Sequence, residues 1–118
     1  MKINEEMYIT LVGMSRFFGI KPFKQGSIIK LIKEKDNIYD DESIRVEMRH
    51  AGQVAYVANS TRTVIRGTMS GGRIYDKIPD EDYAQVKFYS QNGVIAKILT
   101  SDEIAKLKKD PENDLNFI

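Results

Sequence analysis

The sequence predicts a mainly β chain that forms a small closed or partly closed β-barrel of about six strands, with two short helices. Three observations support this. The segments rich in β-branched residues are short and regularly spaced, glycine and proline separate them, and only two stretches carry helix signals. The chain has 118 residues, which suits one domain with its own core. We expect that domain over residues 1–110 and a C-terminal tail over residues 111–118.

The first two strands are expected over residues 8–14 and 27–33. Both segments are rich in isoleucine, leucine and valine, which favour strands. The intervening residues, 15–26, contain two glycines and a proline that interrupt any regular element. The chain should therefore leave the first strand through an irregular loop before it enters the second.

Residues 43–48 show the clearest strand pattern in the chain. Ile44, Val46 and Met48 alternate with charged residues, so one face should be buried and the other exposed to water. The His-Ala-Gly sequence at 50–52 then indicates a hairpin into a fourth strand over residues 53–57.

The next segment, residues 59–66, is expected to be a short helix. Asn59 or Ser60 can cap its N-terminus, and Gly67 would stop it. The Ser-Gly-Gly sequence at 70–72 is expected to be a flexible loop.

Two further strands are expected over residues 83–89 and 93–99. The Asn-Gly pair at 92–93 favours the type I′ turn of a tight hairpin between them. Thr100 and Glu103 have the spacing of a capping box, which predicts a final helix as far as Lys109. The expected element order is therefore β-β-β-β-α-β-β-α.

Composition excludes several kinds of site. The chain has no cysteine and one histidine, so a disulfide framework, a cysteine metal site and a histidine-pair site for zinc or iron are excluded. No apolar run approaches the ~20 residues that span a bilayer, and the N-terminus lacks the apolar core of a secretory signal. We therefore expect a cytoplasmic protein.

The charge distribution is uneven although the net charge is only +1. Residues 16–35 contain six cationic side chains and one acidic side chain, whereas residues 76–82 contain four acids and one lysine. Local fields of this kind can steer a charged ligand. The alternative is that these lysines are simply solvated positions on strands and loops.

No catalytic constellation is visible. The phosphate-binding glycine motifs are absent, and His50 is best interpreted as a solvated turn residue with no partner for a nucleophile. The pair Asp40 and Asp41 could bind a hard cation, but adjacent acids in a turn usually accept local backbone N–H groups. We expect neither enzymatic activity nor a cofactor.

An Arg-Phe-Phe-Gly sequence at 16–19 suggests ligand binding. Consecutive side chains of an extended segment point to opposite sides, so at least one of Phe17 and Phe18 should face outward or line a groove. A nucleic-acid base stacked on such a ring contributes ~1–3 kcal/mol, and Arg16 could pair with a phosphate or stack on a base. Alternatively, one phenylalanine plugs the barrel end and the other is a partly exposed anchor.

Residues 11–59 resemble a HIRAN domain of the free-standing bacterial kind. The matching sequences are Leu-Val-Gly at 11–13, Arg-Phe-Phe-Gly at 16–19, Gly26, Lys-Asp-Asn-Ile-Tyr-Asp at 35–40, Ser-Ile-Arg-Val at 43–46 and Gly-Gln-Val-Ala-Tyr at 52–56. The most specific part is the Asn-x-Tyr-Asp block followed by Ile-x-Val. The chain departs from the family at Ile38, where proline is frequent, and at Phe17 and Phe18, where tyrosine is frequent. It also lacks basic residues directly after Tyr56.

The resemblance implies an OB-like or SH3-like barrel that binds single-stranded DNA, at its 3′-hydroxyl end, in DNA repair or processing. The residues that it assigns to the DNA are Arg16, Phe17, Phe18, Asn37, Tyr39, Asp40 and Tyr56. Asp40 would accept a hydrogen bond from the terminal hydroxyl. Lys21 and Lys24 would make non-specific phosphate contacts.

Two other functions remain open. In a protein-interaction or regulatory barrel, Phe17 and Phe18 would be anchors for a protein partner. An enzyme acting on nucleotides or nucleic acid would need a nucleophile–base pair or a strong metal cluster, and the sequence shows neither. A DNA-end reader would itself need a partner such as a helicase or nuclease.

Overall fold

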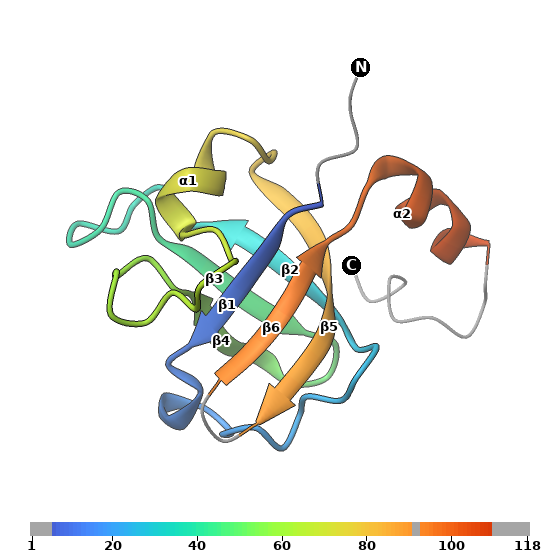
Figure 1. The fold of residues 1–118 in the computed structure, drawn as a ribbon, viewed down its shortest axis with the longest axis horizontal. Helices are drawn as coiled ribbons and strands as arrows, with labels where there is room; N and C mark the ends of the chain where they lie inside the picture. Colours follow the sequence, from blue (N-terminus) through green and yellow to red (C-terminus); the bar gives the residue numbers. More distant parts are fainter. Residues whose placement is uncertain (1–5, 91–92, 110–118) are drawn as a thin grey trace.

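The strands of this protein form a closed antiparallel barrel (Figure 1). The computed structural model describes residues 6–90 and 93–109. The strands are β1 (Tyr8–Val12), β2 (Ile28–Lys33), β3 (Ile44–Met48), β4 (Gly52–Val57), β5 (Glu81–Ser90) and β6 (Gly93–Ile98). The helices are the 3₁₀ turn η1 (Met14–Arg16), α1 (Gly71–Tyr75) and α2 (Ser101–Lys108). The predicted mainly β barrel of six strands with two short α-helices is confirmed, as is the order of these elements.

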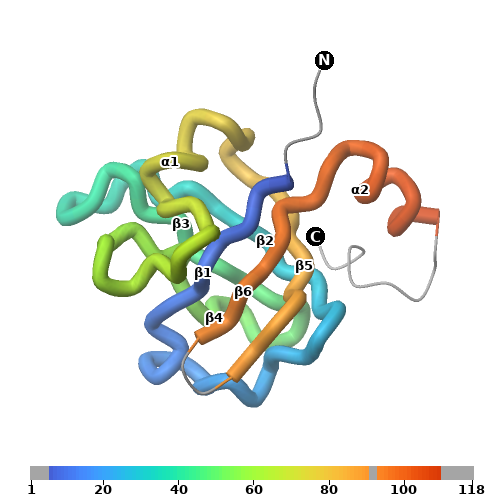
Figure 2. Tube along the Cα trace, viewed as in Figure 1, coloured from blue at the N-terminus to red at the C-terminus, as the bar shows by residue number. Residues whose placement is uncertain are grey.

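The strands follow one another around the barrel in the order β1-β4-β3-β2-β5-β6. The ring closes because β1 pairs with β6 on one side, from Tyr8↔Lys97 to Leu11↔Val94, and with β4 on the other. The tube in Figure 2 shows β1 crossing the front of the barrel between these two neighbours. Each of the six strands therefore has a hydrogen-bonded neighbour on both sides, and no barrel edge is left unpaired.

The barrel interior holds the inward-facing apolar side chains of all six strands. Ile74 of α1 and Phe23, from the loop after η1, belong to the same buried cluster. Figure 1 shows α1 at the upper end of the barrel and that loop at the lower end. Both ends of the core are thus covered by segments outside the sheet.

The prediction of a helix over residues 59–66 is wrong. The segment forms turns, and the amide of Ile65 donates to Thr10 Oγ1 of β1 at 3.1 Å instead of continuing a helix. The helix lies further along, where Ser70 Oγ caps it by accepting from the Arg73 amide at 3.2 Å. A tertiary hydrogen bond has overridden the local helix signal.

The Ser-Gly-Gly sequence at 70–72, expected to be a flexible loop, is therefore the start of α1. Gly72 lets two side chains approach the helix closely, and a larger residue there would displace the Glu42 carboxylate. A Cβ on Gly72 would lie 2.6 Å from Glu42 Oε1 and 3.1 Å from Asn59 Oδ1.

The remaining expected elements are confirmed with shifts at their ends. The first strand ends at Val12 rather than residue 14, and the strand expected over residues 83–89 begins at Glu81. Residues 91–92 of the predicted Asn-Gly turn and the expected tail over 111–118 lie outside the described residues. None of the helices in the described ranges is long and apolar enough to cross a membrane.

Helix α2 is held to the outside of the barrel by one ion pair and a small apolar cluster. The predicted capping box is present, with Thr100 Oγ1 accepting from the Glu103 amide. Ile104 and Leu107 pack against a second cluster of buried residues outside the main core. The Glu103 carboxylate also accepts hydrogen bonds at 2.7 and 2.9 Å from the buried ammonium of Lys97.

This ion pair makes stability depend on pH. Partial burial alone would raise the pKa of Glu103, but hydrogen bonds from Lys97 and Thr100 outweigh it and hold that pKa below its ordinary 4.5. A depressed folded-state pKa gives stabilisation that is complete above pH 4.5 and lost as pH falls through the folded value.

We expect Glu103→Gln to lower the free energy of unfolding at neutral pH by roughly 1 kcal/mol, since the carboxylate is partly exposed. The difference from the unsubstituted protein should shrink as the pH falls below 4.5 and through the folded-state pKa of Glu103, because both proteins then carry an uncharged side chain at this position. Urea unfolding at several pH values measures this. A constant difference across the acid range would show that the Lys97–Glu103 charge is not the cause.

Candidate nucleic-acid interface

A sharp turn after β1 brings the first group of predicted residues together. Gly13 adopts a left-handed conformation, with φ 78°, that ends the strand. The η1 turn follows, and the amides of Phe17 and Gly19 both donate to the Met14 carbonyl at 2.9 Å. This compact turn lies against β4 and carries the exposed Arg16 at its end.

Phe17 contacts Tyr56 of β4, so the fold brings together two sequence blocks that are distant in the chain. Their ring centroids are 6.1 Å apart and the rings are tilted by 51°, which is within the usual range for an aromatic pair. Tyr56 pairs with Val12 of β1 and Arg45 of β3 across the sheet. It therefore stands in the middle of the wall made by β1, β4 and β3.

Phe18 has the opposite environment from Phe17. Its side chain is 53% exposed, whereas Phe17 is half-buried. The expectation that at least one of the two faces outward is confirmed. Both rings line an open hollow of about 540 Å³, whose lining residues are Phe17, Phe18, Lys21, Pro22, His50 and Ala51. His50 is exposed, with a positive φ of 73°, as a turn residue would be.

The second group of predicted residues lies in the loop between β2 and β3, and Asn37 organises it. Asn37 Oδ1 accepts hydrogen bonds from the amides of Tyr39 and Asp40, at 2.8 and 3.0 Å. Its Nδ2 donates to Glu34 Oε1, which also accepts from the Ser43 hydroxyl at 2.7 Å. The structure gives Asn37 a positioning role inside the loop, because both its polar atoms are used there.

This loop holds two large side chains in solvent. Tyr39 is 93% exposed and Ile38 is 86% exposed. Asp40 beside them is half-buried, and its Oδ1 accepts from the Glu42 amide at 2.9 Å. Its Oδ2 has no hydrogen bond to a residue that the structure describes. The carboxylate is thus fixed by one oxygen and can accept a hydrogen bond with the other.

The same loop is tied to α1 through Asn59. Asn59 Nδ2 donates to Glu42 Oε1 at 3.4 Å, and its Oδ1 accepts from the Gly72 amide at 2.7 Å. The sequence pattern indicated Asn59 only as a possible cap of a helix that does not form. Asn59 instead links Glu42, 17 positions before it, to Gly72, 13 positions after it. No local sequence signal indicates hydrogen bonds over such separations.

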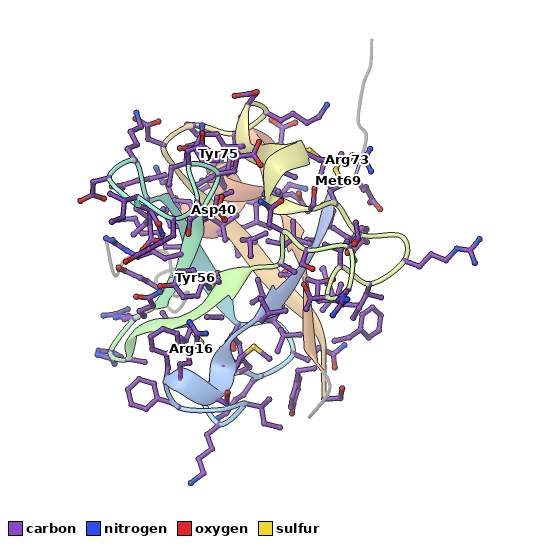
Figure 3. The ribbon with its side chains drawn as sticks, turned by 90° about the vertical axis from the view of Figure 1, so that its left-hand side faces the viewer. Arg16, Asp40, Tyr56, Met69, Arg73 and Tyr75 are labelled. Carbon is purple, nitrogen blue, oxygen red and sulfur yellow. The ribbon has the colours of Figure 1, made fainter. Side chains whose placement is uncertain are left out.

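The two groups of residues share one face of the barrel. In Figure 3, Arg16, Tyr56 and Asp40 follow one another up this face. The topology explains the order, since β4 lies between β1, which leads into the η1 turn, and β3, which the Asp40 loop precedes. We call the surface formed by Arg16, Phe17, Phe18, Tyr39, Asp40 and Tyr56 the Tyr56 face.

The predicted lysine cluster is partly neutralised by the acidic stretch. Lys30 pairs with Glu81 at 3.0 Å and Lys35 with Asp80 at 2.7 Å. The hydrogen bond between Lys35 and Asp80 raises the pKa of Lys35 and lowers that of Asp80. The Lys35–Asp80 pair is exposed on both sides, whereas the Lys30 side chain is only 16% exposed. Both pairs cancel local charge, and the exposed one contributes little to stability.

The remaining cations of this stretch differ in their availability. Lys33 lies over the ring of Tyr75, with Nζ 4.6 Å from the centroid. Within residues 6–90 and 93–109, Arg16, Lys21 and Lys24 make no ion pair with an acidic side chain. Their charges are therefore available to an anionic ligand.

Comparison with solved structures identifies the fold. The chain matches the HIRAN domain of human HLTF with a TM-score of 0.53 at 16% identity, covering 92% of this chain and 90% of that one. It matches a crystal structure of a protein from Lactobacillus plantarum with a TM-score of 0.54, also at 16% identity, covering 80% and 93% respectively. No protein-family model and no curated protein matches the sequence. The fold is HIRAN-like, as the sequence motifs predicted.

The hydrogen bonds of Asn37 give a prediction about the loop. We expect Asn37→Ala to speed hydrogen exchange at the amides of Tyr39 and Asp40 about fivefold or more, because each loses an acceptor worth roughly 1 kcal/mol. Asp36→Ala is the matched control, since Asp36 is exposed and adjacent. Unchanged exchange at both amides would mean that other interactions hold the loop.

Proposed function

We propose that this protein is a non-catalytic module that binds single-stranded DNA at its 3′-hydroxyl end. The observation that carries the proposal is the environment of Asp40. Its carboxylate is held by the backbone through one oxygen, has the other oxygen available, and lies next to the exposed ring of Tyr39. The HIRAN-like fold and the family resemblance of the surrounding motifs support the same assignment.

A fixed carboxylate can distinguish DNA ends by simple chemistry. It accepts a hydrogen bond from a free hydroxyl but repels a terminal phosphate. The loss of such a buried hydrogen bond costs ~1–3 kcal/mol, or one to two decades in affinity. Asp40 would thus supply the end selectivity, with Tyr39 against the terminal nucleotide.

The rest of the Tyr56 face suits bases and phosphates of any sequence. The Phe17–Tyr56 pair and the exposed Phe18 provide rings on which bases can stack. Arg16, Lys21 and Lys24 would contact phosphates, which adds affinity without sequence preference. The role is recognition in DNA repair or processing, and a helicase or nuclease partner would act on the captured end.

We expect Asp40→Asn to abolish the preference for a 3′-hydroxyl over a 3′-phosphate, by about tenfold or more. Asparagine keeps an oxygen for the Glu42 amide and so preserves the loop, but it removes the negative charge. Fluorescence anisotropy at low salt, with oligonucleotides that differ only at the 3′ end, measures the ratio. Asp36→Asn makes the same charge change nearby and should leave the ratio unchanged.

Lys21→Ala provides the contrast. It should weaken binding to both oligonucleotides equally. The slope of the logarithm of the binding constant against the logarithm of the salt concentration should become less steep by about 0.7 for each phosphate contact that is lost. If the unsubstituted protein binds all ends equally and weakly, the end-binding proposal is wrong. The exposed phenylalanines would then be better explained by a protein partner.

A further inference from the structure

A second hollow with aromatic and cationic walls lies at the lower end of the barrel. It has a volume of about 190 Å³ and is lined by Gln25, Lys87, Phe88 and Tyr89. Phe88 is 65% exposed and Tyr89 is 46% exposed. The proposed function does not use these residues.

A β-bulge causes the exposure of Phe88. Side chains two positions apart on a regular strand share a face, so Phe88 would point inward with the fully buried Val86. The register between β5 and β6 shifts between these two residues, where Val86 pairs with Ala96 but Phe88 with Ile95. Because of this shift, the ring of Phe88 points into solvent. Bulges often re-aim a side chain in this way at binding surfaces.

One loop contributes lining residues both to this hollow and to the one formed by Phe17 and Phe18. The loop that follows η1 is fixed to β5, since the Gly26 amide donates to the Val86 carbonyl at 2.8 Å and the Val86 amide to the Ser27 carbonyl at 2.8 Å. Pro22 lines the first hollow and Gln25 the second. They are three residues apart, so their Cα atoms are at most ~11 Å apart.

Figures 1 and 2 show the backbone of this region at the lower end of the barrel. The blue segment that contains η1 and its loop runs beside the orange ends of β5 and β6. The loop after η1 therefore carries lining residues of both hollows, Pro22 of the first and Gln25 of the second.

The charge around the two hollows fits a polyanion. Both hollows combine aromatic rings with a lysine, and neither has an acidic residue in its lining. Lys24, between them in sequence, is exposed. By contrast, the lining of the hollow beside α2 includes three acidic residues, Glu6, Asp102 and Glu103, together with Lys97. Rings alternating with cations match the bases and phosphates of a single strand, whereas a purely apolar protein anchor would not need the cations.

We propose that Phe88 stacks on a base several nucleotides upstream of the DNA end, and that Lys24 and Lys87 contact the phosphates between. This inference rests on the proposed function. With the 3′ end at Asp40, the strand runs in the 5′ direction past Tyr56 and Phe18 and reaches Phe88 last. The protein therefore takes a single-stranded tail of several nucleotides, not merely a terminal nucleotide.

Oligonucleotide length tests this path. We use 3′-hydroxyl strands of about 3 and about 12 nucleotides with the same terminal sequence, since single barrels of this type cover about 4–16 nucleotides. Phe88→Ala should lower affinity for the longer strand about tenfold and leave the shorter one unchanged. Phe88→Tyr retains the ring and should bind the longer strand as the unsubstituted protein does.

A fluorescent variant gives an independent readout. The chain has no tryptophan, so Phe88→Trp introduces a single indole whose emission should be quenched by the longer strand only. Ala105→Trp, at an exposed position on α2, is the matched control and should not respond.

Each contrary outcome has a separate meaning. Equal losses for both lengths in Phe88→Ala, or no quenching in Phe88→Trp, would overturn the upstream path while a 3′-hydroxyl preference still stood. If the unsubstituted protein shows no preference for a 3′-hydroxyl at either length, the proposed function itself fails and the path fails with it.

Discussion

Closure of the barrel through the short strand β1 is the constraint on which the Tyr56 face depends. Most residues of β1 pair with β6, and β1 pairs with only the last two residues of β4, Tyr56 and Val57. Beyond Val12, β1 no longer covers β4. The η1 turn packs there instead and brings Phe17 to Tyr56. An aromatic pair on the outside of the barrel is thus a direct result of where β1 stops.

The charges show a second constraint, which is that the acidic stretch neutralises two lysines of the cationic segment, Lys30 and Lys35. Asp80 and Glu81 lie beside Lys35 and Lys30 because β5 is the hydrogen-bonded neighbour of β2. Arg16, Lys21 and Lys24, which precede β2, make no ion pair with an acidic side chain in the described residues. These three charges are available to an anion, even though the net charge of the chain is only +1.

Much of the fold was accessible from the sequence, because period-2 alternation and capping signals are local. Strand β3 and the capping box of α2 are examples. The position of α1 was not accessible, because it depends on Thr10 and Asn59, which are distant in the chain from the residues they bind. The motifs predicted the HIRAN-like fold, but not the contact between Phe17 and Tyr56, which requires the sheet. The exposure of Phe88 depends on a register shift with no sequence signature.

The hydrogen bonds around Asn37 have a thermodynamic consequence. They fix the backbone under Tyr39 and Asp40 before any ligand arrives. The conformational entropy of the loop backbone is lost when the chain folds, so ordering the backbone does not oppose association. The side chains that a ligand must immobilise still cost about 0.5–1.5 kcal/mol each. A ligand that meets this loop finds its backbone already held in place, and its association rate would be set by diffusion and orientation rather than by a slow rearrangement of the loop.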